Sequence, residues 1–588
     1  MKFASVAGLV LTMLAAPALA QAPTPHNIII FVADGLRYGS VEPNNMPNLF
    51  KLKTEGVDFT NSHSLYPTVT TVNASAIATG HYIGDTGNFG NTLYTAMPMS
   101  SGHGNPVAAL ENNAVLAEMN QKFGGNYLHE DTIIARARAQ GFSTAVIGKQ
   151  GPTRILDSTA ADDGSETLVL DDSTGKEGGI GLPAWFTAGM KAAFVGPATP
   201  ASQVPNIPQQ VHLMKATTRI VLPHFKESGK PFALLFWSRD PDMSQHNTRD
   251  SIGEYEPGIN GPSGKAGTRN ADTMLGELRQ ALKDQGLDKT TDIFVTADHG
   301  FNTTAHVSTT SPSTRFGAAT PRSDLSNGFL AVDLASALKL RLSNPDAANV
   351  DYSAGAKLKE GSGLLGDAKN PDVVVMPSGG SDLIYLPKAN AATLAGEIVN
   401  FLTTQDYVSG VFVADHLGKF PGALPMSALN LVGSAKTPSP AIYVNFRSFS
   451  GACANKLQCG VGIHDSTQAT GQGSHGSLSR AETRNFMAAV GPSFKKGYVD
   501  PAPISNADIT PTLAHIAGIT LAPKGKLRGR VISEALVGGK AVKASRRTLV
   551  SDPAANGART ILNLQEVGDA RYFDAAGFAG KTLGLTVP

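Results

Sequence analysis

The sequence has little net charge and few charged residues of either sign. Lysine and arginine together number 49, against 48 aspartate and glutamate residues, and the formal net charge is +1. A near-neutral chain lacks the basic surface with which proteins bind nucleic-acid duplexes, so we expect no such partner. Charged residues make up 16% of the chain and hydrophobic residues 41%. This composition is typical of folded globular proteins and excludes extended disorder.

Cysteine is also scarce, with only Cys453 and Cys459 present. Two cysteines cannot form a cysteine-based zinc site by themselves, and although His464 follows, no tetrahedral set of ligands is evident. A close pair of cysteines in an oxidising compartment typically forms a disulfide. We therefore predict a disulfide between them.

Long hydrophobic runs are missing, apart from one at the N-terminus. This run extends from Val6 to Ala16, follows Lys2, and precedes the small-x-small sequence 18–20 (Ala-Leu-Ala). It is shorter than the roughly 17 residues that a membrane helix needs. The pattern is that of a signal peptide at residues 1–20. We expect a periplasmic or secreted protein that begins near Gln21 and has no membrane span.

Several short runs of apolar, often β-branched residues have the pattern of strands that are buried on both faces of a parallel sheet. Helical patterns lie between them, for example at Asp131–Gln140 and Thr273–Gln285. Alternating strands and helices predict an α/β fold, with a doubly wound, mostly parallel sheet flanked by helices. The expected strands are His26–Ala33, Thr144–Ile147, Phe232–Trp237 and Asp292–Thr296.

The composition changes near residue 301, where loops rich in serine, threonine and proline begin. We expect residues 21–300 and 471–540 to form the two parts of the α/β core, residues 301–470 an inserted cap, and residues 541–588 a segment of short strands. A capped helix is predicted at Asn506–Gly518. Residues 361–366 match G-x-G-x-x-G, but they follow a polar stretch and not a strand, so we predict a loop there and no dinucleotide site.

Most of the acidic residues and histidines of interest follow predicted strands, at the sheet edge where open α/β sheets bind ligands, while His475 lies in the glycine-rich stretch 471–477. Each of them alone has an ordinary explanation, such as a helix cap, a turn or a buried histidine. Together they form the inventory of two metal sites with mixed oxygen and nitrogen ligands. The candidate ligands are Asp34, Asp242, His246, Asp298, His299 and His475.

These residues lie in segments that resemble the metal and nucleophile segments of the alkaline phosphatase superfamily. Among its branches, the chain is most similar to the type I phosphodiesterases/nucleotide pyrophosphatases. The resemblance covers residues 26–300 and 470–535, in the same order and with similar spacing. The five segments are IIIFVADG (28–35), PTVTTVN (67–73), DPDMSQH (240–246), TADHG (296–300) and GSHGS (473–477).

The resemblance implies a role for each of these residues. The P-T-x-T-x-x-N pattern identifies Thr70 as the nucleophile, a choice that the residues alone do not make among Thr68, Thr70 and Thr71. Asn91 lies at the family's spacing for the amide that binds a phosphoryl oxygen. One metal would be held by Asp34, Thr70, Asp298 and His299, and the other by Asp242, His246 and His475.

The implied cofactors are two divalent metal ions. Zinc suits mixed aspartate and histidine ligands, although manganese, iron and cobalt occupy similar sites. A dication lowers the pKa of a coordinated hydroxyl group, which makes a threonine a competent nucleophile. The resemblance thus implies a phospho-threonine intermediate that water then hydrolyses.

The substrate class is less firmly indicated. Nucleotide pyrophosphatases of this family carry an aromatic residue directly after the nucleophile, and here that residue is Thr71. Trp237 is either a stacking face for a base or an ordinary buried aromatic. Lys149 resembles the lysine of a Gly-Lys-Asp-Arg segment in monoesterase relatives, where both cations bind the phosphate charge. Here Gly151 replaces the arginine. Lys149 could equally be an ordinary lysine on a solvated loop after a strand. We therefore favour a small phosphodiester as substrate, with alkaline phosphomonoesterase activity as the alternative.

Some other functions of the superfamily are less consistent with the sequence, and two stay open. A sulfatase would need a C/S-x-P-x-R segment at the nucleophile, which PTVTTVN is not. Cofactor-independent mutases of the superfamily use serine and work in the cytoplasm, which disagrees with a threonine at position 70 and with the predicted signal peptide. Phosphonoacetate hydrolases share a threonine nucleophile and stay open as an alternative. So does a metal-binding protein without catalytic activity, since a fold alone does not establish turnover.

Overall fold

The structure is a computed structural model that describes Met1 and residues 26–102, 104–247, 250, 258–315, 324–347, 350–351, 358–451 and 453–588. The predicted signal peptide, Met1 excepted, lies outside the described residues. Within these ranges, no helix is both long enough and apolar enough to cross a membrane.

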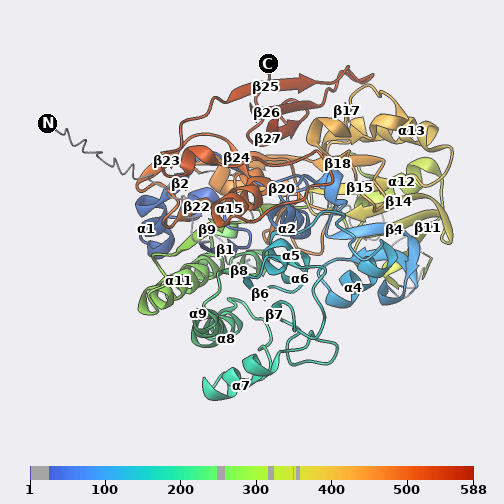
Figure 1. The fold of residues 1–588 in the computed structure, drawn as a ribbon. Helices are drawn as coiled ribbons and strands as arrows, with labels where there is room; N and C mark the ends of the chain where they lie inside the picture. Colours follow the sequence, from blue (N-terminus) through green and yellow to red (C-terminus); the bar gives the residue numbers. More distant parts are fainter. Residues whose placement is uncertain are drawn as a thin grey trace.

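A central sheet of eight strands forms the core (Figure 1). Strand β1 lies in its middle and pairs in parallel with β8 on one side and β9 on the other. The sheet is mixed, because β22 runs antiparallel to both of its neighbours. In spatial order the strands are β23 (Tyr498–Asp500), β2 (Val57–Phe59), β22 (Met487–Val490), β9 (Thr291–Thr296), β1 (Asn27–Ala33), β8 (Phe232–Ser238), β6 (Ser143–Gly148) and β7 (Leu168–Asp171).

Helices cover both faces of this sheet, because successive side chains of a strand point to opposite faces. Ile30 and Val32 of β1 pack in one apolar cluster with α2 and α15, while Ile29 and Phe31 pack in another with α1 and α11. The predicted α/β fold with a central sheet flanked by helices is confirmed. The four helices are α1 (Pro47–Glu55), α2 (Thr70–Thr79), α11 (Pro262–Asp284) and α15 (Ile509–Ala517).

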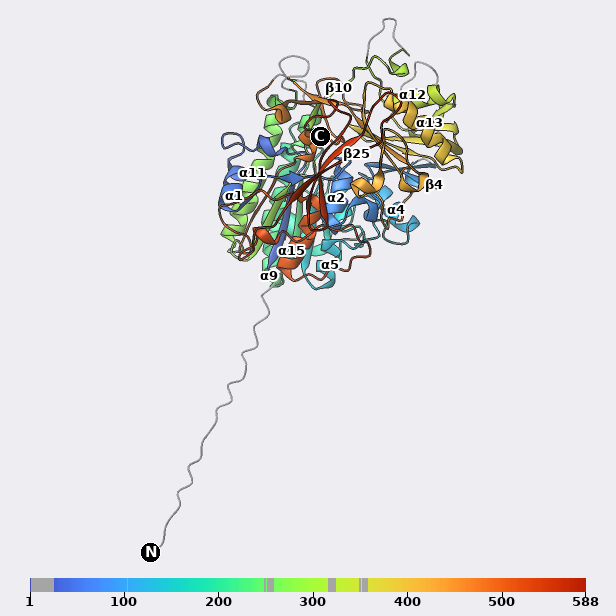
Figure 2. The ribbon, with the colours of Figure 1, turned by 90° about the horizontal axis from the view of Figure 1, so that it is seen from above.

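A second sheet of eight strands lies between residues 342 and 446 and has its own apolar cluster. Two helices, α12 (Phe329–Leu338) and α13 (Ala391–Thr403), belong to that cluster. Figures 1 and 2 both show them on the side of the molecule away from α1 and α11. The strands, in spatial order, are β12 (Val350–Asp351), β11 (Leu342–Asn344), β13 (Gly363–Asp367), β14 (Asn370–Pro377), β15 (Ser381–Tyr385), β18 (Ile442–Phe446), β16 (Val408–Val413) and β17 (Leu424–Pro425).

One prediction about local structure is wrong, and a predicted helix is longer than expected. The G-x-G-x-x-G stretch at 361–366 is not wholly a loop, because its second half belongs to β13, where Leu364 and Leu365 are buried and pair with β14. The predicted helix at Thr273–Gln285 is the second half of α11, which ends at Asp284 and begins earlier, at Pro262. Glycine at 267 permits this early start, because a Cβ there would lie 2.6 Å from the Cβ of Ser244.

Four smaller sheets complete the described fold, and one of them is the two-stranded pair of β3 (Ser62–His63) and β24 (Ile504–Ser505). Strands β25 (Ser545–Val550), β26 (Ile561–Val567) and β27 (Ala570–Gly577) form an antiparallel sheet near the C-terminus, and β4 (Thr92–Met99) pairs with β5 (Asn105–Ala109). A four-stranded sheet joins β10 (Asn302–Ala305) to β21 (Gly473–Ser474), which brings the segment before His475 beside the end of β9. The predicted disulfide between Cys453 and Cys459 is confirmed.

Candidate metal centre and nucleophile

The candidate residues gather at the carboxyl edge of the central sheet. Asp34 follows β1, Lys149 follows β6, and Asp298 follows β9 after one intervening residue. Asp242 begins helix α10 (Asp242–Asn247), shortly after β8. These strands are neighbours in one parallel set, so residues far apart in the sequence meet at a single edge.

Thr70 is the first residue of α2 and is buried against this cluster. Its Oγ1 lies 3.4 Å from Nε2 of His299 and accepts a hydrogen bond from Nζ of Lys149 at 3.2 Å. The other two threonines make different contacts. The hydroxyl of Thr68 donates to the carbonyl of Ser477, and that of Thr71 donates to the carbonyl of Gly90. Among the three, Thr70 is the one whose hydroxyl faces the acidic cluster.

One group of potential metal ligands consists of Asp34, Asp298 and His299, whose ligand atoms all lie within 4.8 Å of one another. Nε2 of His299 is 3.2 Å from Oδ2 of Asp298 and 3.7 Å from Oδ1 of Asp34. Both carboxylate oxygens are buried and make no hydrogen bond to any described residue. Buried carboxylate oxygens without donors are strongly disfavoured, and a cation at this position would satisfy them.

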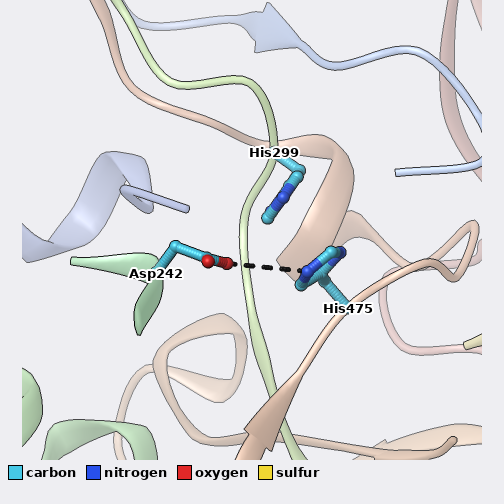
Figure 3. Close-up of side chains that lie close together, drawn as sticks. All are labelled: Asp242, His299 and His475. Carbon is cyan, nitrogen blue, oxygen red and sulfur yellow. Dashed lines mark ion pairs between the residues drawn. The ribbon is translucent and has the colours of Figure 1, made fainter. Parts of the chain in front are cut away.

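A second group consists of Asp242, His475 and again His299, within the same 4.8 Å limit (Figure 3). Oδ1 of Asp242 is 3.6 Å from Nε2 of His475 and 3.2 Å from Nε2 of His246. The rings of His299 and His475 stack at 3.6 Å between centroids. His299 therefore lies between the two groups, and His246 borders the second one.

The three histidines share one arrangement that suits metal binding. In each ring Nδ1 lies next to a backbone carbonyl oxygen, so that this nitrogen carries the proton and Nε2 has a free lone pair toward the cluster. Metal-bound histidines are typically fixed in this way. The distances are 3.0 Å from His246 to Gly473, 2.9 Å from His299 to Gly300, and 2.8 Å from His475 to Thr68.

Without cations, the buried site disfavours the ionised form of its carboxylates. Burial and the nearby Asp242 carboxylate, opposed by Lys149, raise the pKa of Asp34 from 3.8 to about 6. Burial and the Asp34 carboxylate raise the pKa of Asp298 well above its ordinary value, and burial lowers the pKa of His299 to about 4. Two dications would lower the pKa values of the carboxyl groups again and would bind the neutral imidazoles. The residues present therefore fit two metal ions.

Lys149 lies inside the site and not on a solvated loop. Its side chain is 5% exposed, and its ammonium group is 3.0 Å from Asp34, 2.9 Å from Glu111 and 3.6 Å from Asp242. Glu111 follows the β4–β5 pair and was not found from the sequence, because no motif marks it.

Asn91 precedes β4 and lies beside the nucleophile's helix. Its Oδ1 accepts hydrogen bonds from the backbone N–H and the hydroxyl of Thr71, at 2.9 and 3.0 Å. The helix N–H of Thr71 is thus already used, and the NH₂ group of Asn91 makes no hydrogen bond to a described residue.

Trp237 offers no stacking face for a base. Its ring is fully buried in the core, and its Nε1 donates a hydrogen bond to Oδ2 of Asp34 at 2.8 Å. The residue orients a candidate metal ligand instead. Nothing in the sequence distinguishes these two uses of a tryptophan, because the choice depends on the packing of β8 against α2 and α6 (Pro152–Leu156).

Comparison with known proteins agrees with this geometry. The family model for type I phosphodiesterase / nucleotide pyrophosphatase matches residues 28–333. The chain belongs to this family. Its members are metal-dependent phosphoester hydrolases of the alkaline phosphatase superfamily. No curated protein matches the chain. The matched region of this phosphodiesterase-family chain includes Thr70 and the candidate ligands up to His299, while His475 lies beyond it.

Proposed function

We propose that the chain hydrolyses phosphodiesters at a centre of two divalent metal ions, with Thr70 as the nucleophile. The observation that carries this proposal is the convergence of two buried groups of potential ligands, sharing His299, on the hydroxyl of Thr70. Membership in a family of phosphoester hydrolases supports the reaction class. The structure and the family together favour turnover over a purely binding role.

The metal ions would be bound by the residues described above, and zinc suits their oxygen and nitrogen atoms. When bound, the ions would stabilise the charge on the attacking and departing oxygens of the reaction. One ion would be held by Asp34, Thr70, Asp298 and His299, and the other by Asp242, His246 and His475.

The protein's own groups would act in two displacements. Oγ1 of Thr70 forms a bond to phosphorus while the bond from phosphorus to the departing alcohol breaks. Lys149, which donates to this oxygen, favours its deprotonated form. The NH₂ group of Asn91 donates to a phosphoryl oxygen. In the second displacement a water oxygen binds phosphorus, the bond to Thr70 breaks, and a phosphate monoester leaves.

The charge balance around Lys149 supports a diester. Its ammonium group lies between 2.9 and 3.6 Å from three carboxylates, those of Asp34, Glu111 and Asp242. Gly151, where monoesterase relatives have arginine, adds no positive charge. This segment therefore brings a single cation to the nucleophile, where its Nζ donates to Oγ1 of Thr70.

The proposal is tested by comparing kcat/KM on an aryl phosphate diester, an aryl phosphate monoester, ATP and an aryl sulfate. We expect the diester to give the highest value and the sulfate the lowest, because the charge of the site matches a monoanionic phosphoryl group. A preference for the monoester would make the chain a phosphatase. A preference for the sulfate, or no turnover of any ester by the metal-loaded protein, would refute the proposed function.

A second prediction concerns Lys149→Ala. We expect monoester hydrolysis to fall by about 10- to 100-fold, which corresponds to the loss of one charge-assisted hydrogen bond of about 1.5–3 kcal/mol. Diester hydrolysis should fall less, since that substrate lacks the second negative charge. Parallel kcat/KM measurements on both ester types check this. Equal, small losses on both would show that Lys149 does not contact the phosphoryl group.

A further inference from the structure

The position two residues after Lys149, where monoesterase relatives have arginine, cannot supply a second cation. Gly151 has a backbone φ of +88°, in the left-handed region, and a Cβ at this residue would lie 2.7 Å from Cα of Glu111. A side chain here would be strained and would collide with the backbone. If the site binds a second cationic group, that group must come from another segment.

Arg239 comes from the neighbouring strand. Strands β6 and β8 pair in parallel with Gly148 opposite Trp237, and the N–H of Lys149 donates to the carbonyl of Trp237 at 3.2 Å. Lys149 is one residue beyond Gly148, and Arg239 is two residues beyond Trp237. The two basic residues therefore lie at the same end of neighbouring strands. The guanidinium group of Arg239 bonds to the carboxylate of Asp172, which also accepts the N–H of Gln150.

A carboxylate interacts with both cations. Glu111 is 2.9 Å from the ammonium of Lys149. Burial lowers the pKa of Arg239, but nearby carboxylates, those of Asp172, Glu111 and Asp242, raise it overall. The side chain of Glu111 is 39% exposed, so it is free to turn toward solvent. Nε of Arg239 is buried and donates to no described residue. The Glu111 carboxylate thus lies near two cationic groups, and one of them, the guanidinium of Arg239, has an unused N–H donor among the described residues.

We propose that Arg239, together with Lys149, binds a second negative charge on the substrate, in the place that the Glu111 carboxylate takes in the free protein. This inference rests on the proposed function, because it deepens the substrate class of the same site. The charge would belong either to a phosphoryl group adjoining the reacting one or to the third unesterified oxygen of a monoester. A guanidinium group binds such oxygens through two parallel N–H donors, which a lysine cannot do.

The test compares three substrates with the metal-loaded protein. Methyl para-nitrophenyl phosphate carries one negative charge, para-nitrophenyl phosphate carries two on one phosphorus, and diadenosine diphosphate carries one on each of two adjoining phosphoryl groups. In Arg239→Met we expect the ratio of kcat/KM for a doubly charged substrate to that for the singly charged one to fall by about 10- to 100-fold. A fall for diadenosine diphosphate alone assigns the subsite to an adjoining phosphoryl group, and a fall for para-nitrophenyl phosphate alone assigns it to the third oxygen.

Three further variants make the result specific. Arg239→Lys should recover part of the ratio, because it keeps the charge and loses the paired donors. Glu111→Gln should lower KM for the doubly charged substrate, because it removes the competing carboxylate. Arg279→Met is the matched control. Arg279 lies on α11, forms an ion pair with Glu55 of α1 at 2.9 Å, and has a side chain 26% exposed, against 24% for Arg239. This variant should leave all three activities unchanged.

An equal change on all three substrates in the Arg239 variants would overturn the inference and leave the proposed function standing. The same conclusion would follow from an unchanged KM in Glu111→Gln, which is independent of whether Arg239→Met folds. If the wild-type protein hydrolyses none of the three substrates, the proposed function itself fails.

Discussion

Replacing Thr70 with alanine is expected to lower kcat by about four orders of magnitude or more, as the loss of a covalent nucleophile does in other hydrolases. Among the three neighbouring threonines, the hydroxyl of Thr70 is the one that faces the ligand groups, 3.4 Å from His299 and 3.2 Å from Lys149. The substitution removes one hydroxyl group at the first residue of a helix, so the fold should persist. Steady-state kinetics and circular dichroism check the two parts of this prediction.

The controls for this prediction come from the same segment. Thr70→Ser keeps the hydroxyl group and should retain a measurable part of the activity. Thr71→Ala removes a hydroxyl that bonds to Asn88, Gly90 and Asn91 and not to the candidate ligands, and should cost far less than Thr70→Ala. Rapid acid quenching of the wild type followed by mass spectrometry should find the phosphoryl adduct on Thr70. Full activity in Thr70→Ala would show that the nucleophile is another group.

The sequence was sufficient to predict the central sheet because its strands are buried on both faces. The runs at β1, β6, β8 and β9 have apolar, often β-branched centres, which mark them in the sequence, and their ends deviate from prediction by at most one residue. Asp34, Asp298 and His299 were found by the same route, because they lie just after β1 and β9, whereas Asp242, His246 and His475 needed the family segments as well. Strand ends and family segments thus carry most of the information about the site.

The second sheet was much harder to predict. Its strands pair antiparallel, and segments such as β13, with the sequence Gly-Leu-Leu-Gly-Asp, lack an alternation that could distinguish a strand from a loop. Leu364 and Leu365 become a strand only because β14 lies beside them, which is a tertiary effect. A prediction made from local pattern has no access to that partner.

The electrostatic partners of the site were missed for a related reason. Glu111 and Arg239 contribute through the hairpin after Asn91 and through the register of β6 against β8, and neither relation is visible along the chain. Trp237 was considered for stacking, but its orientation toward Asp34 depends on packing. Residues that act by position, without a motif, need the structure.

Removal of the metal ions is expected to abolish activity, because three carboxylates are buried together with one lysine as their nearest cation among the described residues. Oδ1 of Asp34 and Oδ2 of Asp298 have no hydrogen-bond donor there. The purified protein should contain close to two transition-metal ions per chain by elemental analysis, as expected for a two-metal site. Dialysis against a chelator should lower kcat by about three orders of magnitude or more, and added Zn²⁺ should restore it.

A second readout separates metal binding from catalysis. Ligands that bind only the folded state stabilise it, so chelation should also lower the melting temperature, and Zn²⁺ should raise it again. Asp298→Asn keeps the size of the side chain but removes a charge from the first group of ligands, and should reduce the metal content toward one ion per chain while the protein stays folded. The matched control is Asp163→Asn, whose carboxylate bonds to the backbone N–H of Ser165 in an exposed turn and should leave the metal content at two. Full activity in protein shown to be metal-free would refute the two-metal mechanism, whatever the activity of Thr70→Ala.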